Sequence, residues 1–488
     1  MIYKKGYIIL LILFFCVYFI NSLNFKIKTK NEKELLIKAI FDMGFSAKGI
    51  ADGIGTEDYE SVFFKPAFHI QDFGIGLVFD FRFRFFTGQI TFFTTDWFIP
   101  DDPVNTFFLY LDKIDYIKYG DFTSPVFLNV GKNPTTTLGT GFLVKNFHNH
   151  AFLPVSREWG LMTKFNCNYL NKFKADNFPF DATLIISDLL DPDLFILDTG
   201  LDILKLIKLN DNFSFRIGQI LATDVNTTES NRLSSLSRDE DEITSHRNLS
   251  TTDYNHFTSF PLFLSYYTDY VWKHDLVKVN GFGEFVSLFD FASKYSSFNY
   301  GFGIKLGTEA VFINLPNSGY LLGTILGFII ESPHYTLDYF GPNYEVVRTK
   351  QYLDLYTDPD YTFYITTGFA IYAFDEKIKF RAIVTIPFEA PFSMKISASF
   401  VLEDTLVKGL YAELYYETGV NPFTFMGYDF ITDDFRFSAN FGYKFFGVKI
   451  AVLLGVQKPA WVGSYFETQD QYAKELQKFV SLEISFVL

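Results

Sequence analysis

Histidine and serine side chains are the first candidates for chemistry in this sequence. His148 and His150 flank Asn149, and His-x-His pairs occur in metal sites. No cysteine or acidic cluster lies near them to complete a ligand set. A Ser-His pair oriented by an amide would hydrolyse lipid esters, but no spacing singles out such a pair among the 7 histidines. We therefore predict no catalytic, cofactor-binding or metal site and no enzymatic activity.

Two further stretches resemble binding motifs only superficially. Residues 238–242 read RDEDE, but a calcium loop of the EF-hand type spaces its ligands over twelve residues. We interpret this run as solvated loop charge. The sequence GFGEF at 281–285 lies inside an alternating polar and apolar pattern, so we interpret it as part of a strand and not as a phosphate-binding loop.

Three basic residues are notable because the chain as a whole is acidic. Its formal net charge is −14, which argues against a nucleic-acid partner. Lys132, Lys145 and Arg157 nevertheless fall in one glycine-containing stretch. If this stretch folded into a pore, it would narrow the pore and favour anions. We predict a constriction at these three residues; the alternative is that Arg157 pairs with a carboxylate and braces the fold.

The elements that would position these residues are predicted to be β-strands. Residues 480–488 alternate between an apolar and a polar face, and residues 393–402 and 435–446 do the same. Such segments are close to the length that a tilted transmembrane strand needs, and they recur along the chain roughly eighteen to twenty-two times. Either a soluble sandwich or a membrane barrel produces this alternation, because both bury one face of each strand.

Chain length and loop lengths favour the barrel. A sandwich rarely extends over this many residues as one unit, and no change in composition divides the chain. Short turns alternate with long polar connections at 223–256 and 332–362. We therefore predict, for residues 23–488, a single antiparallel transmembrane β-barrel with short periplasmic turns and long extracellular loops. Residues 31–56 are predicted to form either its first strand or an inward hatch.

The N-terminus has the pattern of a secretory signal peptide. Lys4 and Lys5 precede an apolar run at 7–20, so residues 1–22 are predicted to be removed on export. The mature chain would then keep one of the two cysteines, which cannot form an internal disulfide. We predict the outer membrane of a diderm bacterium as the location, with membrane lipid as a partner.

One block resembles a known group of proteins. Around residues 116–161 the sequence is similar to outer-membrane β-barrel, porin-like proteins, chiefly of spirochaetes, and residues 65–85 fit their early strands. The resemblance implies the fold and the location but no settled activity. The final strand, residues 480–488, also looks like the C-terminal strand that the outer-membrane assembly machinery recognises. The matching positions of the block are Gly131, Lys132, Leu138, Gly139, Thr140, Gly141, Asn146, Phe147, His148, Asn149, Pro154, Arg157 and Gly160.

These observations predict an outer-membrane channel for passive or substrate-specific uptake of small solutes. A barrel of this size leaves an aqueous lumen unless part of the chain fills it. Two alternatives stay open. One is a transporter of hydrophobic compounds resembling the fatty-acid barrels, which the abundance of phenylalanine favours. The other is a surface-exposed binding barrel or adhesin that uses its long loops.

Overall fold

The computed structural model describes the parts of the chain that form strands and the turns beside them. The predicted signal peptide, Pro154, Arg157, residues 238–242 and residue 488 lie outside the described residues. The described residues are 27–28, 34–35, 37–51, 56–86, 89–92, 94, 97–98, 100, 103–111, 113–122, 124–149, 159–166, 179–189, 192, 194–207, 212–224, 261–274, 277–292, 297–312, 320–335, 339–340, 361–374, 377–388, 394–420, 436–445, 448–457 and 477–487.

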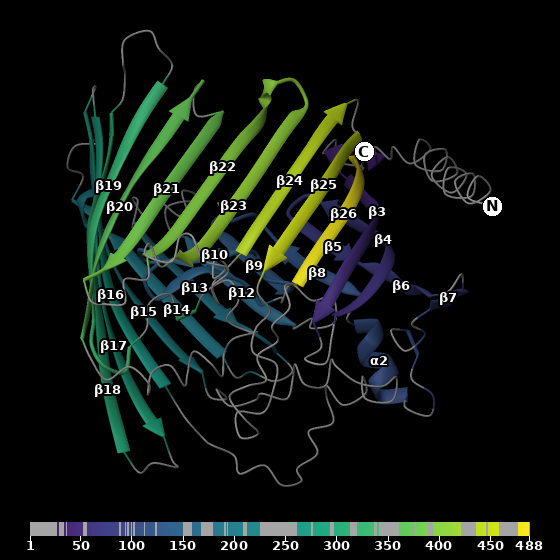
Figure 1. The fold of residues 1–488 in the computed structure, drawn as a ribbon, viewed down its shortest axis with the longest axis horizontal. Coiled ribbons are helices and arrows are strands. Elements are labelled where there is room, and N and C mark those ends of the chain that lie inside the picture. The colour runs from purple at the N-terminus through teal and green to yellow at the C-terminus, as the bar shows by residue number, and fades with distance from the viewer. Residues whose placement is uncertain are drawn as a thin grey trace.

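Almost all of these residues lie in antiparallel strands (Figure 1). The strands of the wall are β3 Ile37–Ala51, β4 Thr56–Ile70, β5 Phe73–Leu77, β6 Phe79–Phe86, β7 Gln89–Phe92, β8 Ile114–Tyr119, β9 Val126–Gly131, β12 Gly160–Asn166, β13 Phe180–Ile186, β14 Leu194–Asp202, β15 Phe213–Asp224, β16 Pro261–Lys273, β17 Val277–Ala292, β18 Ser297–Phe312, β19 Tyr320–Glu331, β20 Thr362–Ala373, β21 Ile378–Pro387, β22 Met394–Val407, β23 Leu410–Val420, β24 Arg436–Phe445, β25 Val448–Gln457 and β26 Gln477–Val487. Away from the wall lie β1 Ile27–Lys28 with β2 Glu34–Leu35, and β10 Thr136–Leu138 with β11 Val144–Phe147.

The wall strands close into one barrel. Each strand pairs with its sequence neighbours, β26 pairs with β3, and β9 pairs with β12 to complete the ring. β5 and β6 both pair with β4, and they continue one another in the same strand position. β7 and β8 likewise share the next position, because β7 pairs with β6 and β8 with β5. The result is a closed 20-strand antiparallel barrel, which confirms the predicted fold.

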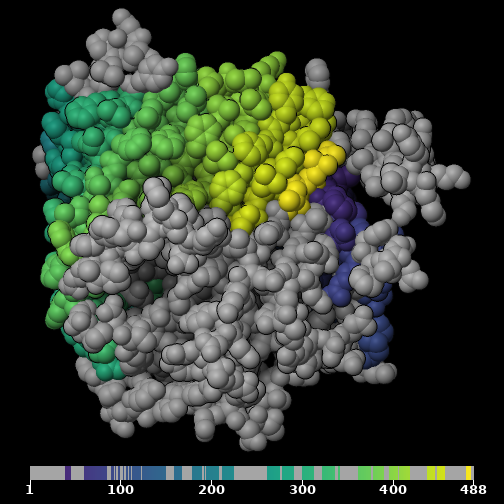
Figure 2. Space-filling model, in the orientation of Figure 1, coloured from purple at the N-terminus to yellow at the C-terminus, as the bar shows by residue number. Residues whose placement is uncertain are grey.

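The alternation of the sequence sets which face of each strand points outward. On β26, Val480 and Leu482 are 50% and 43% exposed, whereas Ser481 between them is 6% exposed. Directly paired residues point to the same face of the sheet, so the pairing register fixes the orientation of each strand around the ring. The outer surface is therefore apolar, as lipid requires of a membrane barrel. Figure 2 shows strands β22–β26, green to yellow, as a continuous outer wall.

The two rims of the barrel differ, as predicted. Because the strands are antiparallel, alternate connections lie at the same rim. One rim, which we call the short-turn rim, has short connections at residues 71–72, 408–409 and 446–447, and its longest connection is 167–179. The other rim has the longest connections of the barrel, between β9 and β12, β15 and β16, and β19 and β20. β3 begins and β26 ends at the short-turn rim, so residues 37–51 of the predicted hatch or first strand form a strand of the wall.

Two helices interrupt this pattern. α2 Pro103–Leu111 is inserted between β7 and β8. Trp97, which precedes it, stacks on the outward ring of Phe81 with 4.7 Å between ring centroids. α3 Ile203–Leu206 follows β14, and its first turn is capped by Asp202, whose carboxylate accepts a hydrogen bond from the backbone N–H of Lys205. Within the described part of the chain, no helix is long and apolar enough to span a membrane.

Candidate constriction inside the barrel

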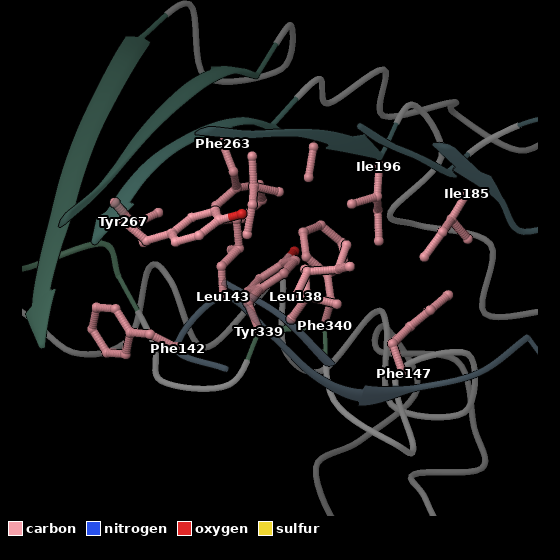
Figure 3. Packing of buried hydrophobic residues seen from close by; sticks show 14 of the residues in the cluster. Leu138, Phe142, Leu143, Phe147, Ile185, Ile196, Phe263, Tyr267, Tyr339 and Phe340 are labelled. Carbon is pink, nitrogen blue, oxygen red and sulfur yellow. The ribbon is translucent and has the colours of Figure 1, made fainter. Parts of the chain in front are cut away.

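The connection between β9 and β12 folds into the barrel. Within it, β10 and β11 form an antiparallel hairpin with Thr136 opposite Phe147 and Leu138 opposite Val144. We call residues 136–147 the inward hairpin. Figure 3 shows its side chains pointing at inward-facing residues of the wall. It contains the Leu-Gly-Thr-Gly sequence and Asn146-Phe147 of the block that was singled out by its resemblance to porin-like barrels.

Asn149 fastens the base of the inward hairpin to the wall. Its Nδ2 donates to the carbonyl oxygens of Gly131 (3.1 Å) and Ser187 (3.0 Å), and its Oδ1 accepts from the backbone N–H of Asn133 (2.7 Å). Gly160 leaves room for this amide, because a Cβ there would lie 2.3 Å from Nδ2 of Asn149. Gly131 has φ +110°, a conformation that glycine adopts without strain. These predicted block residues therefore meet in one structural joint.

Asn149→Ala is expected to weaken this joint. The substitution leaves two buried carbonyl oxygens and one buried N–H without their partner, at roughly 1–3 kcal/mol for each such group. We expect a lower urea midpoint for the refolded barrel in detergent, and faster proteolysis near residue 149. Asn166→Ala, at the opposite end of β12, is the control. Equal stability of Asn149→Ala and the native chain would contradict the assigned role.

Asn146 shapes the stem of the hairpin. It adopts φ +52°, which asparagine tolerates better than most residues. The Oγ1 of Thr137 donates to Oδ1 of Asn146 (3.1 Å) and accepts from its backbone N–H (2.9 Å). This reciprocal pair bridges β10 and β11 where their register is irregular.

The tip of the hairpin is held by one buried carboxylate. Glu284 of β17 is 2% exposed, and its Oε2 accepts from the backbone N–H and the Oγ1 of Thr140 (2.9 and 2.6 Å) and from the N–H of Phe142 (3.4 Å). Gly139 and Gly141 have φ +58° and +70°, which turn these donors toward the carboxylate. The Leu-Gly-Thr-Gly sequence thus forms the binding site for the Glu284 carboxylate.

Neighbouring polar groups complete this contact. Ser265 donates from Oγ to Oε1 of Glu284 (2.8 Å), and Nζ of Lys305 donates to the carbonyl oxygen of Thr140 (2.9 Å). Glu284 therefore accepts hydrogen bonds at both oxygens, as a buried carboxylate must. The strand that contains GFGEF is confirmed, but the importance of its glutamate was missed. Asp290 also faces inward on β17, so the sequence pattern alone did not distinguish Glu284.

Apolar side chains dock the hairpin against one arc of the wall. Phe142, Leu143 and Val144 are fully buried. They belong to the main apolar core, which also includes the inward residues Ile196 and Phe263 (Figure 3). Inward residues of membrane barrels are usually polar, so these wall residues are apolar because the hairpin covers them.

A second inward segment packs beside the first. The N–H of Phe340 donates to the carbonyl of Leu143 (3.0 Å), and the N–H of Lys145 donates to the carbonyl of Phe340 (3.1 Å). The rings of Tyr339 and Phe263 lie 4.5 Å apart. Within the predicted outer loop 332–362, the described residues 332–335 and 339–340 therefore fold toward the inward hairpin. Their aromatic side chains gain more by burial against the hairpin than by exposure.

Lys145 reaches the far side of the barrel. Its Nζ lies 3.7 Å from Oε1 of Glu417 on β23, and Nζ of Lys395 on β22 lies 3.5 Å from the same oxygen. The hydroxyl of Tyr415 also donates to the Glu417 carboxylate. In the ring order, β23 lies about half way round from the β9–β12 root of the hairpin. The hairpin therefore bridges the lumen.

The two described residues of the predicted constriction, Lys132 and Lys145, lie apart. The backbone N–H of Lys132 donates to the carbonyl of Asp115 of β8 (2.8 Å), at the root of the connection. Lys145 lies at the other wall, and Arg157 is outside the described residues. A constriction at all three stays a prediction, whereas Lys145 has a defined partner in Glu417. Sequence reasoning missed Glu417 because it is distant in the chain.

The wall has two arcs of opposite charge. Strand register assigns each described side chain to the inner or the outer face. On β13–β20, which the hairpin covers, the inward acidic residues are Asp181, Asp198, Asp202, Asp224, Asp269, Glu284, Asp290, Glu309 and Glu331, and the basic ones are Arg216, Lys273, Lys278 and Lys305. We call the remaining arc the open arc. Its inward basic residues are Lys65, Arg82, Arg84, Lys118, Lys164, Lys379, Arg381, Lys395, Lys444 and Lys449, and its acidic ones are Asp42, Asp80, Glu403, Glu413, Glu417 and Glu483.

Metal binding is the remaining chemistry to consider. Among the residues that the structure describes, no group of three or more histidine, cysteine or acidic side chains is arranged to hold a metal ion. His148 is described and lies at the base of the hairpin, but His150 is outside the described residues.

Comparison with known proteins shows similarity to solved barrel structures only. No protein-family model and no curated protein matches the sequence. OccK5 (OpdH) of Pseudomonas aeruginosa is 9% identical with a TM-score of 0.36, and 93% of this chain and 98% of that chain are covered. A BenF-like porin from Pseudomonas fluorescens Pf-5 is 8% identical with a TM-score of 0.34 and the same coverage. The copper transporter OprC is 9% identical with a TM-score of 0.39, covering 93% and 80%. These values are too low to transfer a function.

Proposed function

We propose that this chain is an outer-membrane channel for passive or substrate-specific uptake of small solutes. The observation that carries the proposal is the arrangement of the lumen. A 20-strand barrel is wide enough for an aqueous channel. The inward hairpin covers one arc of its wall, and charged side chains line the other. Such a layout narrows a pore and surrounds the passage with charge, which are the two requirements for selective diffusion.

The nature of the lumen disfavours the fatty-acid type of transporter. Such a barrel would need an apolar inner surface open to its cargo. Here the apolar inward residues of the main core, such as Phe263 and Ile196, are fully buried under the hairpin. The open arc instead contains ion pairs, including Lys65 with Glu483 and Lys395 with Glu417. A hydrated solute fits this surface better than a lipid.

Location and assembly belong to the same proposal. The apolar outer surface and the closed ring suit the outer membrane of a diderm bacterium, which the chain would reach through the signal peptide at 1–22. The outward apolar face of β26 supports a role for residues 480–488 in recognition by the assembly machinery. The meeting of Gly131, Asn149 and Gly160 of the resembling block at the base of the inward hairpin supports kinship with the spirochaetal porin-like barrels.

Single-channel recording tests the proposed function. The mature chain, refolded in detergent, should give stepwise conductance in a planar lipid bilayer. A heat-modifiable band on a semi-native gel establishes that the barrel is folded, and detergent without protein is the control. A folded barrel that stays silent over many insertions would contradict an open channel and favour a surface-binding role for the long loops.

A further inference from the structure

We propose that the solutes admitted by this channel are small anions, and that the ammonium groups of Lys145 and Lys395 contact them at the constriction. The inference rests on the proposed channel function and names its substrate class. It does not follow from the overall charge of the chain, which is −14 and would suggest attraction of cations.

The first observation concerns how deeply Glu417 and its two lysine partners are buried. The side chain of Glu417 is 9% exposed, whereas those of Lys145 and Lys395 are 31% and 28% exposed. Two lysines share this one carboxylate, and the hydroxyl of Tyr415 donates to it as well. The carboxylate is therefore less exposed to the lumen than the two ammonium groups, and a passing ion meets the ammonium groups first.

The same order of depth recurs along the open arc. Lysine and arginine have long apolar stems, so their charged ends reach beyond the shorter carboxylates toward water. The side chain of Lys65 is 38% exposed against 20% for Glu483. Across the barrel, Arg381 of the open arc is 44% exposed against 12% for Glu309. Two pairs reverse this order, Lys379 with Glu403 and Lys118 with Asp121, and both lie at the short-turn rim.

Much of the opposing charge does not face the passage. The inward acidic residues of the covered arc include Glu284, Asp224 and Asp290, which are 2%, 0% and 1% exposed. Glu284 accepts hydrogen bonds from the hairpin tip itself, so the docked hairpin shields this carboxylate. The buried carboxylates of this arc contrast with the lysines Lys65, Lys145 and Lys395, which face water. A narrow passage between low-dielectric walls concentrates the field of the exposed charges, which here is positive.

Reversal potentials across a potassium chloride gradient test the proposal. The native channel should pass chloride in preference to potassium. Lys145→Gln combined with Lys395→Gln should lower the chloride-to-potassium permeability ratio by at least roughly fivefold, since each removed unit charge about 4 Å from a passing ion in water contributes about 1 kcal/mol. Glu417→Gln should shift the ratio the other way, because it removes the shared negative charge. Lys273→Gln, on an exposed lysine at the short-turn rim of the covered arc, is the matched control.

Each result has a definite meaning. A cation-preferring native channel, or an unchanged ratio in the double lysine variant, would overturn the anion proposal while leaving the channel function in place. Unitary conductance separates loss of charge from undocking of the hairpin, since an undocked hairpin raises conductance. A folded barrel without conductance would contradict the channel function, and the anion proposal would fall with it.

Discussion

Glu284→Ala is expected to release the inward hairpin and raise the single-channel conductance. The substitution removes the acceptor for two backbone N–H groups and one hydroxyl at residues 140–142. Hydrogen bonds to a charged acceptor contribute about 1.5–3 kcal/mol each. A net loss of about 3 kcal/mol would shift the ratio of docked to undocked hairpin roughly a hundredfold. Planar-bilayer recording should show larger and noisier conductance steps.

Two variants control for this result. Glu284→Gln keeps the shape and one acceptor oxygen, so it should lie between the native chain and the alanine variant. Glu309→Gln neutralises another inward carboxylate, which pairs with Arg381 and Tyr372 and not with the hairpin. Its conductance level should stay native. If Glu284→Ala also kept native conductance, the hairpin tip would not depend on this carboxylate.

Phe142→Ala is expected to destabilise the docked hairpin by about 3–5 kcal/mol, the usual range for truncating a fully buried phenylalanine. Phe142 has no exposed surface, and its ring packs against Tyr335 of the second inward segment at 5.4 Å. The ring also occupies the space above Gly303, where a Cβ would lie 2.7 Å from Cζ of Phe142. Limited proteolysis of the refolded barrel should cut the hairpin of this variant much faster than the native one.

An outward phenylalanine on the same wall is the matched control. Phe285 follows Glu284 on β17, and it is 38% exposed on the outer face. Phe285→Ala should leave cleavage of the hairpin unchanged. Gly303→Val offers an independent test, because it fills the space under Phe142 from the wall side. If Phe142→Ala and Gly303→Val both retained native protection, docking would not depend on this contact.

The hairpin shows how far a local pattern can be interpreted. The glycines and asparagines of residues 131–160 stood out by their types and spacing, and each described one has a structural reason. Gly139 and Gly141 adopt positive φ, and Asn149 joins three backbone groups. The three basic residues in the same stretch were predicted to act together. Of the two that the structure describes, Lys132 lies at the root of the hairpin and Lys145 across the lumen.

The partners of the hairpin could not be found from the sequence. Glu284 lies 144 residues from Thr140, and Glu417 is farther still. Nothing in the local pattern of β17 or β23 separates these glutamates from other inward carboxylates. The arrangement of the two arcs was likewise hidden, because only the docked hairpin decides which arc of the wall is covered.

The sequence by itself determined the strands, the face of each strand that points outward and the difference between the rims. These depend on period-two alternation and on connection length, which are local properties that one stretch of chain contains in full. Only the tertiary structure decided where the inward hairpin docks, which carboxylates hold it and which arc stays open to solutes. Those outcomes depend on ring closure, which brings β9, β17 and β23 around one lumen although they are far apart in the chain.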